Sequence, residues 1–407
     1  MAVSNGAASD SFSIYGFSKS FSVVNRYPEW KRPDTVPNPP DISWISNRLR
    51  FNLKWNAGDP LALHFSYDLV PRLQHRTRLA QLLSFMSIDP LLYRIADLDS
   101  RLYPSPDASV RDFMITQNLD RAYAVITASF ADIMVGRQPV AWGTARVINP
   151  MDIIAPYAYG ELDTEDRIGV DAARVRVPLG FMGEFDGGYV FGRDGKFKNS
   201  ALFLRTKLYA AGTDMSLIML GFHENLLAGF DLVRAIGGAG FWLEGAQVFV
   251  DALADSGGGH DDYFRASVGA DYSFGDRLYG FAEYHYNQVG TTEPEDYLTN
   301  LSHPAYTEGA VYLLGEHYLT PGITYQFSPL VICHVQALCN LTDPSAYVTP
   351  QLEINITQNA YLAGGAYLGI GKTPEFAFES FDSYTITFRS EFRGYPNTFF
   401  AALNVYF

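Results

Sequence analysis

The sequence predicts an all-β protein: a single transmembrane antiparallel β-barrel of about 18 strands, with short periplasmic turns and long extracellular loops. Three observations lead to this fold class. Apolar and polar residues alternate with a period of two along many segments, so each segment would have one apolar and one polar face as a strand. Most of these segments extend over about ten residues or more, the length of a tilted membrane strand. The connections between them sort into a short and a long group.

The alternation is clearest in residues 48–55, RLRFNLKW, where odd positions are apolar and even positions are polar or charged. The same division recurs along the chain, in 174–177, 204–208, 264–268, 351–356 and 403–407. No uninterrupted apolar run reaches the roughly 18 residues of a membrane helix. Strands are therefore the predicted membrane-crossing elements.

The predicted strands belong to one barrel domain that comprises residues 1–407. In chain order they are 11–24, 43–56, 60–70, 119–130, 133–142, 167–178, 183–193, 199–211, 213–223, 225–236, 239–252, 262–274, 277–289, 317–328, 330–341, 346–356, 360–371 and 396–407.

The connections follow the parity of the strands. Those after even-numbered strands are all short, and those after odd-numbered strands include every long one, namely 25–42, 71–118, 143–166, 290–316 and 372–395. Short turns on one side and long loops on the other are typical of an outer-membrane barrel. The parity places both termini on the periplasmic side and predicts an integral protein of the bacterial outer membrane, in contact with its lipids and lipopolysaccharide.

Composition excludes several other classes. With 30 Lys and Arg against 44 Asp and Glu, the formal net charge of −14 argues against a nucleic-acid partner, which would require clustered cations. Residues 1–10, MAVSNGAASD, contain no signal peptide, as in a mature chain. Cys333 and Cys339 lie about 20 Å apart in an extended strand, too far for a disulfide.

The sequence also argues against an enzyme. It contains no GxSxG, HExxH or P-loop motif, so no catalytic residues are assigned. The lack of CxxCH and CxxC pairs predicts that this chain binds no haem and no metal itself. Acidic clusters near the predicted outer loops show no ligand spacing and are interpreted as a solvated surface, with cation bridges to lipopolysaccharide as the alternative.

The last two residues suggest a role in assembly. Tyr406 and Phe407 end a strand with alternating apolar residues behind it. This pattern resembles the C-terminal signal of bacterial outer-membrane proteins, which implies recognition by the barrel-assembly machinery. Aromatic residues near other predicted strand ends, such as Trp55 and Tyr272, would suit headgroup depth.

One segment carries a more specific resemblance. Residues 136–156 read GRQPVAWGTARVINPMDIIAP, followed by DAAR at 171–174. This resembles the GRQxxxWG…NPxD pattern of a broad group of proteobacterial porin-like proteins, similar in style to alginate-export and porin–cytochrome barrels. The motif covers about a tenth of the chain, and it implies a single outer-membrane barrel and a role in passage across that membrane. It implies no particular substrate.

The same segment predicts a fixed loop. Pro150 and Pro156 disfavour a regular strand over 143–166. We expect Arg137, Arg146 and Asp152 to anchor this loop to the barrel wall by charge-assisted hydrogen bonds. Either the loop folds into the pore and narrows it, or it is a surface loop held by structural ion pairs.

Alternation also assigns the lumen. Charged side chains are costly on the lipid face, so the polar face of each strand should line the inside. The predicted lining or pathway residues are Arg48, Arg50, Lys54, Arg121, Arg174, Arg176, Arg205, Lys207, Arg265, Asp271, Glu283 and Glu353. Either these charges simply pair with one another, or the arginines provide a pathway that prefers anions.

The segment 71–118 is too long for a passive tip. Apolar residues recur at helical spacing over 79–86 and again over 91–98, on either side of Pro90. Two short helices could plug the lumen, cap it outside or dock a partner. The alternative is a compact extracellular loop with its own small core.

Three functions follow as hypotheses. The first is a porin-like channel for small polar solutes, with anions as the narrower possibility. The second is the sheath of a porin–cytochrome complex, in which a multihaem c-type cytochrome held in the lumen supplies the haems for electron transfer. The third is a structural or adhesive barrel whose loops bind a partner outside.

Overall fold

The computed structural model describes residues 11–28, 41–74, 93–108, 111–157, 159–255, 259–380 and 383–407. Nearly all regular structure in these residues is β-strand, and the two α-helices, α2 (Tyr297–Asn300) and α3 (Pro304–Thr307), have one turn each. None of the helices in the described part of the chain is long and apolar enough to cross a membrane.

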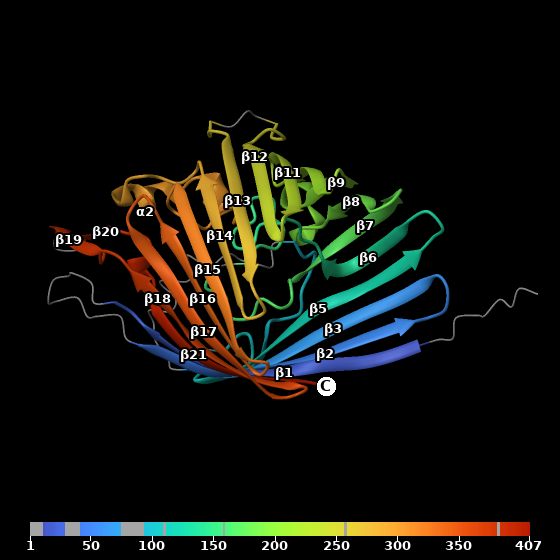
Figure 1. Ribbon diagram of the computed structural model, residues 1–407, viewed down its shortest axis with the longest axis horizontal. Coiled ribbons are helices and arrows are strands. Elements are labelled where there is room, and N and C mark those ends of the chain that lie inside the picture. Colours follow the sequence, from blue (N-terminus) through green and yellow to red (C-terminus); the bar gives the residue numbers. More distant parts are fainter. Residues whose placement is uncertain are drawn as a thin grey trace, which may run out of the picture.

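Eighteen antiparallel strands form one closed barrel, as the sequence predicts (Figure 1). Closure comes from β1, which pairs with β2 on one side and with β21 on the other, from Phe17 opposite Tyr406 to Arg26 opposite Asn397. The wall strands are β1 (Ser11–Arg26), β2 (Ile42–Asn56), β3 (Leu61–Gln74), β5 (Phe113–Thr127), β6 (Asp132–Pro139), β7 (Gly169–Leu179), β8 (Gly183–Val190), β9 (Ala201–Ala210), β10 (Thr213–Phe222), β11 (Asn225–Ile236), β12 (Ala239–Phe249), β13 (Tyr263–Phe274), β14 (Leu278–Asn287), β15 (His317–Ser328), β16 (Val331–Asn340), β17 (Ser345–Thr357), β18 (Ala360–Ile370) and β21 (Asn397–Tyr406).

The structure differs from the sequence prediction in a few places. The strand predicted over 119–130 begins earlier, because 113–118 continue the pairing with β3. The strand predicted over 133–142 ends at Pro139, after which the chain turns into the barrel. Two small elements were not predicted: β4 (Arg101–Tyr103), which pairs with β5, and a hairpin of β19 (Glu375–Ser380) and β20 (Ser383–Thr387).

The connections separate the barrel into two ends. At the short-turn end the strands are joined by 57–60, 128–131, 180–182, 211–212, 237–238, 275–277, 329–330 and 358–359. At the long-loop end the connections include 75–112, 140–168, 288–316 and 371–396. Residue 407 lies at the short-turn end, where its backbone exchanges two hydrogen bonds with Gly16.

The two faces of the wall have opposite character. On β2, Phe51 and Trp55 point outward and are about 40% exposed, whereas Arg50 and Asn52 point inward and are buried. On β10, however, the inward residues Ile218 and Leu220 are apolar and fully buried. A polar inner face is therefore correct for part of the barrel only, because near the long-loop end the wall packs against a second layer of chain.

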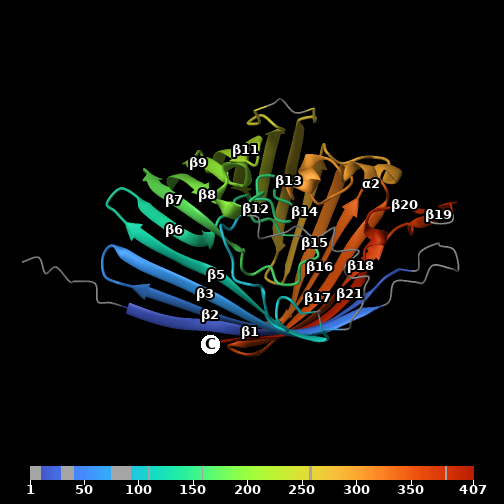
Figure 2. The same cartoon turned by 180° about the vertical axis from the view of Figure 1, so that it is seen from behind.

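That second layer is residues 140–168, called the interior loop below. Both views show this green segment inside the ring of strands (Figures 1 and 2). Its Val140, Trp142, Met151 and Ile153 belong to one buried apolar cluster with inward residues of β9 and β10, including Phe203, Ile218 and Leu220. The barrel therefore has a hydrophobic core inside its lumen, which fixes the interior loop against one wall.

Candidate functional site

The interior loop contacts most of the barrel wall in turn. From β6 it reaches β8, where Trp142 donates its indole N–H to Asp186 at 3.5 Å. Farther along, Tyr159 accepts a hydrogen bond from Gln336 on β16. Its last part returns to β1 and β2, where Asp163 pairs with Lys19 and Arg48. The loop predicted over 143–166 thus lies inside the barrel rather than on its outer surface.

A first strand carboxylate holds the loop through its backbone. Glu244 on β12 is fully buried and accepts backbone N–H groups at 2.8, 3.1 and 2.9 Å, from Thr144, Ala145 and Met151. The structure thus neutralises this charge with three amide dipoles from the loop. Close packing supports the same arrangement, since a Cβ at Gly229 would meet the Met151 side chain at 2.8 Å.

A second strand carboxylate holds the next residues. Glu283 on β14 is buried and accepts the backbone N–H groups of Arg146, Val147 and Ile148, the closest at 2.7 Å. It also accepts the indole N–H of Trp242 at 2.8 Å. Six consecutive or nearby backbone donors of the interior loop therefore end on two wall carboxylates, which we call the carboxylate clamp (Glu244 and Glu283).

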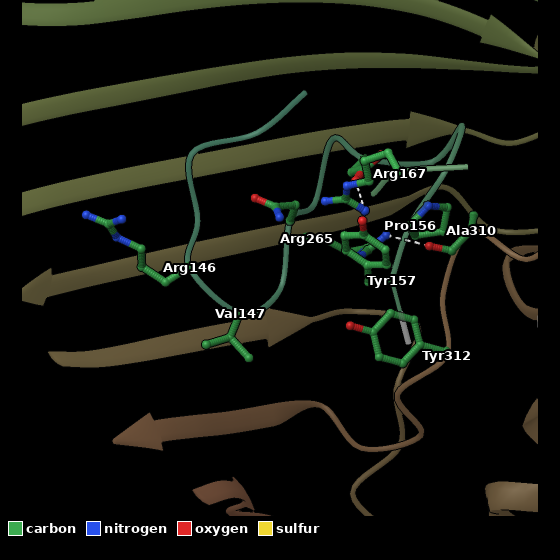
Figure 3. A pocket seen from close by; sticks show the side chains of 10 residues that line it. Arg146, Val147, Pro156, Tyr157, Arg167, Arg265, Ala310 and Tyr312 are labelled. Carbon is green, nitrogen blue, oxygen red and sulfur yellow. Dashed lines mark hydrogen bonds and ion pairs between the residues drawn. The ribbon is translucent and has the colours of Figure 1, made fainter. Parts of the chain in front are cut away.

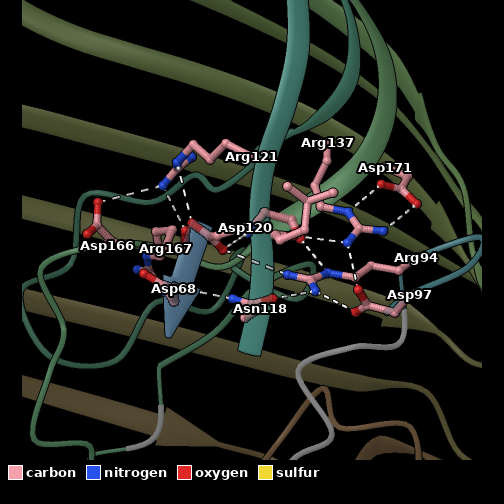
Figure 4. Close-up of polar contacts among 12 residues, drawn as sticks. Asp68, Arg94, Asp97, Asn118, Asp120, Arg121, Arg137, Asp166, Arg167 and Asp171 are labelled. Carbon is pink, nitrogen blue, oxygen red and sulfur yellow. Dashed lines mark hydrogen bonds and ion pairs between the residues drawn. The ribbon is translucent and has the colours of Figure 1, made fainter. Parts of the chain in front are cut away.

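The other end of the loop is held by side-chain charges. On the β1–β7 side, inward charged side chains of the strands form ion pairs with charged side chains of the loop (Figure 4). Arg50 is 1% exposed and binds Asp120 at 2.6 Å and Asp68 at 3.3 Å, and lies 3.6 Å from Asp166 of the loop. We call this network the ion-pair wall; its members are Lys19, Arg48, Arg50, Asp68, Arg94, Asp97, Asp120, Arg121, Arg137, Asp163, Glu165, Asp166 and Asp171.

Two loop carboxylates show the effect of these cations. Burial alone would raise the pKa of Asp163, but the hydrogen bond from Lys19 and the charge of Arg48 outweigh burial, so that the pKa is lowered. The pKa of Glu165 is lowered against burial in the same way, chiefly by Lys19 and Tyr406. Both loop residues are therefore held as anions at neutral pH, which keeps the end of the interior loop on the wall.

Between the interior loop, β13 and residues 310–312 lies a polar cavity of about 90 Å³ (Figure 3). Three guanidinium groups line it, from Arg146 and Arg167 of the loop and Arg265 of β13. Arg265 is 3% exposed and donates to the carbonyl of Ala310, while its Nε has no hydrogen-bond partner among the described residues. The cavity therefore offers unused donors with an excess of positive charge.

One carboxylate faces these cations. Asp152 is buried, and its Oδ2 lies 2.8 Å from Arg167 Nη1. Burial raises the pKa of Asp152 to about 6, against the opposing charge of Arg167. The net charge of the cavity thus changes between +2 and +3 near this pH.

The structure corrects one predicted anchor. Arg137 has no bond to the described residues of 143–166; it donates to Asp171, to Asp97 and to the carbonyl of Ala96. Its partners Ala96 and Asp97 belong to the long connection 75–112, whose residues 93–97 lie against β7 inside the barrel. Arg146 is bound to the wall twice, by its guanidinium to Asp271 of β13 at 2.8 Å and by its backbone N–H to Glu283, whereas Asp152 pairs with Arg167 within the loop.

The segment 71–118 is only partly covered by the structure. Tyr93 is buried in the apolar cluster of the interior loop, so this end of the segment packs into the barrel instead of forming a separate core. The helices predicted around 79–86 and 91–98 fall largely outside the described residues, and 93–98 contains no helix.

The predicted lining residues divide into four groups. Arg48, Arg50 and Arg121 meet in the ion-pair wall, and Arg265 and Glu283 touch the interior loop or its cavity. The rest of the cations pair locally: Arg174 with Asp186, Arg176 with Glu184, Arg205 with Asp231 and Lys207 with Asp214. Asp271 binds Arg146, whereas Lys54 and Glu353 have no ion pair with the described residues.

Sequence reasoning missed Glu244 and Lys19. Glu244 is the single carboxylate in the apolar strand segment 241–249, FWLEGAQVF, which is itself a signal because an unpaired charge in such a run needs a buried partner. Lys19 stands in a serine-rich strand and alternates normally. Its partner Asp163 lies 144 positions away in the sequence, so no local sequence pattern predicts the pair.

The fold and interior loop define a closed porin-type barrel, and solved structures share this architecture. No family model and no curated sequence matches the chain. Acinetobacter baumannii OccAB4 is similar over 100% of both chains, with a TM-score of 0.55 and 9% identity. Pseudomonas aeruginosa OccD3 (OpdP) matches 99% of this chain and 92% of its own, with a TM-score of 0.55 and 9% identity.

A third structure, Pseudomonas aeruginosa OpdK with vanillate, matches 97% of this chain and 98% of its own at a TM-score of 0.54 and 8% identity. These neighbours are outer-membrane porins with 18-strand barrels. At such identities the similarity establishes the fold, including the number of strands. These similarities do not confirm the resemblance based on the GRQxxxWG…NPxD pattern or the resemblance to porin–cytochrome barrels.

Proposed function

We propose that this chain is an integral outer-membrane channel for small polar solutes, with its interior loop as the constriction. The observation that carries the proposal is a wall that is apolar outside, with a charged and loop-filled inside. Leu217 and Phe327, for example, point outward and are 68% and 57% exposed. Lipid acyl chains around the barrel would cover these apolar side chains. The channel neighbours of the same fold support this reading.

The orientation of the proposed channel follows from its two ends. Short turns face the periplasm and long loops face outward in barrels of this type. The C-terminal Tyr406 and Phe407 would then lie on the periplasmic side, where we expect the barrel-assembly machinery to recognise them. Phe407 packs edge-on against the outward Phe51, at 6.0 Å between ring centroids, so its ring belongs to the outer face.

The solute class is proposed from the cavity beside the interior loop. Three arginines against one carboxylate favour a polar solute that carries a carboxylate or a similar anion. Most other lumen cations are neutralised by neighbouring carboxylates, so the anion preference rests on this cavity rather than on the whole lining. No catalytic residue or cofactor of the chain itself enters the proposal.

The interior loop also favours a channel over a cytochrome sheath. A multihaem cytochrome would need the central space that residues 140–168 and 93–97 share. Because the clamp and the ion-pair wall fix these segments from both sides, admitting such a partner would break buried hydrogen bonds and ion pairs. No contact of the described residues favours an adhesive barrel.

Single-channel recording in planar lipid bilayers tests the proposal. We expect discrete conductance steps and, across a potassium chloride gradient, a reversal potential displaced toward the anion. A folded barrel that shows no conductance at any voltage would contradict the channel. Conductance with a cation-displaced reversal potential would retain the channel and reject the anion preference. Co-purification of a haem protein from native membranes would instead support the sheath.

A further inference from the structure

A second cationic pocket lies at the long-loop rim of the barrel, where β18 ends. It has a volume of about 440 Å³ and is lined by Lys372, Arg389 and Arg393 together with Ile370 and its neighbours. None of these residues belongs to the interior loop or to its cavity. The pocket is therefore separate from the proposed solute path.

Ile370 shows which face of the wall the pocket borders. It is the last residue of β18, is 55% exposed and pairs with Ala346 of β17. The inward positions of these strands are Tyr347 and Tyr367, which are buried inside the barrel. Ile370 thus points outward and marks the upper limit of the apolar outer face.

The cations stand directly after this limit in the chain and in space. Lys372 follows Ile370 by two residues and is exposed, and its ammonium group has no partner among the described residues. Arg389 is bonded to Glu375, and Arg393 donates to the carbonyl of Gly369 at 3.0 Å. Counting the three cations and the adjacent Glu375, the described residues at this pocket carry a local charge of about +2 in a chain whose net charge is −14.

Strand β1 contributes a further cation near this pocket, Arg26, which is itself paired with Asp41 at 3.5 Å. Arg26 at the end of β1 pairs with Asn397 of β21, whose side chain accepts the backbone N–H of Gly369. Its guanidinium lies over the ring of Phe399, an outward residue, at 5.9 Å from the ring centroid. The β19–β20 hairpin, from the same loop as Lys372, projects sideways beyond the wall in both views (Figures 1 and 2).

We propose that Lys372, Arg389 and Arg393 bind the phosphorylated headgroup of a membrane lipid whose acyl chain lies along the outward face of β18. A lipid fits better than a soluble anion because the pocket joins guanidinium and ammonium donors to an exposed apolar side chain at one boundary. Arginine and lysine on long stems reach from an apolar surface to a charged headgroup layer in this way. The proposal rests on the proposed membrane placement, and not on conductance.

Native mass spectrometry of the full-length barrel in detergent tests the site. The probe is lipid A, which carries phosphates, compared at equal concentration with a diacylglycerol that has none. Lys372→Gln alone should reduce lipid A binding about fivefold, and the triple variant Lys372→Gln, Arg389→Gln and Arg393→Gln should reduce it by well over tenfold, since each basic residue near a charged surface contributes on the order of 1 kcal/mol. Diacylglycerol binding should stay low and equal throughout.

Matched controls separate charge at this pocket from charge in general. Lys54→Gln removes a cation that points into the lumen near the short-turn end, and Lys196→Gln removes an exposed loop lysine. Both should bind lipid A like the unaltered chain. Circular dichroism and heat-modifiable gel mobility should show that each variant is folded; because Lys372 is exposed, the single variant tests the site even if the triple variant does not fold.

The outcomes are distinguishable. Equal lipid A binding by the unaltered chain and the folded Lys372→Gln variant would overturn the proposal. Competition by inorganic phosphate at the same concentration as lipid A would show a soluble-anion site and would also overturn it. Selective loss of lipid A binding with unchanged single-channel conductance would support it, whereas absent conductance with intact lipid A binding would reject the proposed channel alone.

Discussion

The interior loop is held on two sides of the barrel by two different kinds of contact. The ion-pair wall uses side chains on both partners, as between Arg50 and Asp166 or Lys19 and Asp163. The carboxylate clamp uses wall side chains but only the backbone of the loop. The difference matters because every residue except proline has a backbone N–H donor, so the clamp fixes residues 144–151 without using their side chains. Ile148 and Met151 are buried in the apolar clusters, and Arg146 lines the cavity.

The largest effect is expected from breaking the ion-pair wall at its centre. Arg50→Met should destabilise the barrel by about 3–5 kcal/mol, because Asp68 and Asp120 would remain buried without their main cation. Urea unfolding in detergent, followed by circular dichroism, measures this change. Lys54→Met, on the same face of β2 but with no ion pair to the described residues, is the matched control and should change stability by less than about 0.5 kcal/mol. Equal losses for both would show that Arg50 carries no special role.

Breaking the clamp should have a somewhat smaller cost but a larger effect on the pore. Glu283→Gln replaces one carboxylate oxygen by an NH2 group, so at least one loop N–H group loses its acceptor and the others lose a charged one, at a cost of about 3 kcal/mol. We expect the released loop to give a higher and noisier single-channel conductance. Glu244→Gln should behave in the same way.

The control for the clamp is Glu353→Gln, a carboxylate on β17 that is predicted to face the lumen and has no contact with the loop among the described residues. It should leave both the conductance level and its noise unchanged. If the Glu283 and Glu244 variants also keep the original conductance while remaining folded, the loop would not be positioned by the clamp.

The same comparison explains what the sequence could predict. The barrel wall follows from local alternation, and the predicted strand order, number and closure agree with the structure, because each strand needs only its own two faces to be specified. Pro150 and Pro156 also predicted that 143–166 is a loop and not a regular strand. Of its three predicted anchors, Arg146 does bond the wall, through Asp271 of β13. Arg137 instead donates to residues 96–97, and Asp152 pairs with Arg167 inside the loop.

The clamp in particular could not be read from side-chain complementarity. Glu283 was predicted to line the lumen, but its partners in the loop are the backbone N–H groups of Arg146, Val147 and Ile148. Nearly every residue type has such a group, so the sequence does not indicate which ones will bind a carboxylate. Inward apolar residues such as Ile218 and Phe222 likewise contradicted a purely polar lumen. These inward residues are buried because they pack against loop residues more than 60 positions earlier in the chain.

A smaller effect should separate the cavity from both anchoring systems. The raised pKa of Asp152, about 6 in the folded barrel, means that burial disfavours its charged form. The contribution of Asp152 to stability should therefore be largest below about pH 4 and fall by about 3 kcal/mol between about pH 4 and pH 6, opposite in sign to a carboxylate with a lowered pKa. Anion selectivity should rise as the pH falls below 6, because the cavity then loses its one negative charge.

Reversal potentials at pH 5 and pH 8 measure this selectivity change. Asp152→Asn should show the high anion selectivity at both pH values and should lose the fall in stability between about pH 4 and pH 6. A selectivity change of equal size in the Asp152→Asn variant would assign the titration to another group.

The smallest structural effect is expected at Arg146, where the two roles of one residue can be separated. Its backbone N–H is bound by Glu283 at 2.7 Å, while its side chain is 55% exposed and bonded to Asp271. Arg146→Gln keeps the backbone donor, so stability should change by less than about 1 kcal/mol, as for an exposed ion pair. The cavity nevertheless loses one of three cations, so anion selectivity should fall measurably in the same bilayer recordings. If Arg146→Gln released the loop, with the noisy conductance expected of Glu283→Gln, the loop would be held by its side chains on this wall as well, and the distinction between the clamp and the ion-pair wall would be lost.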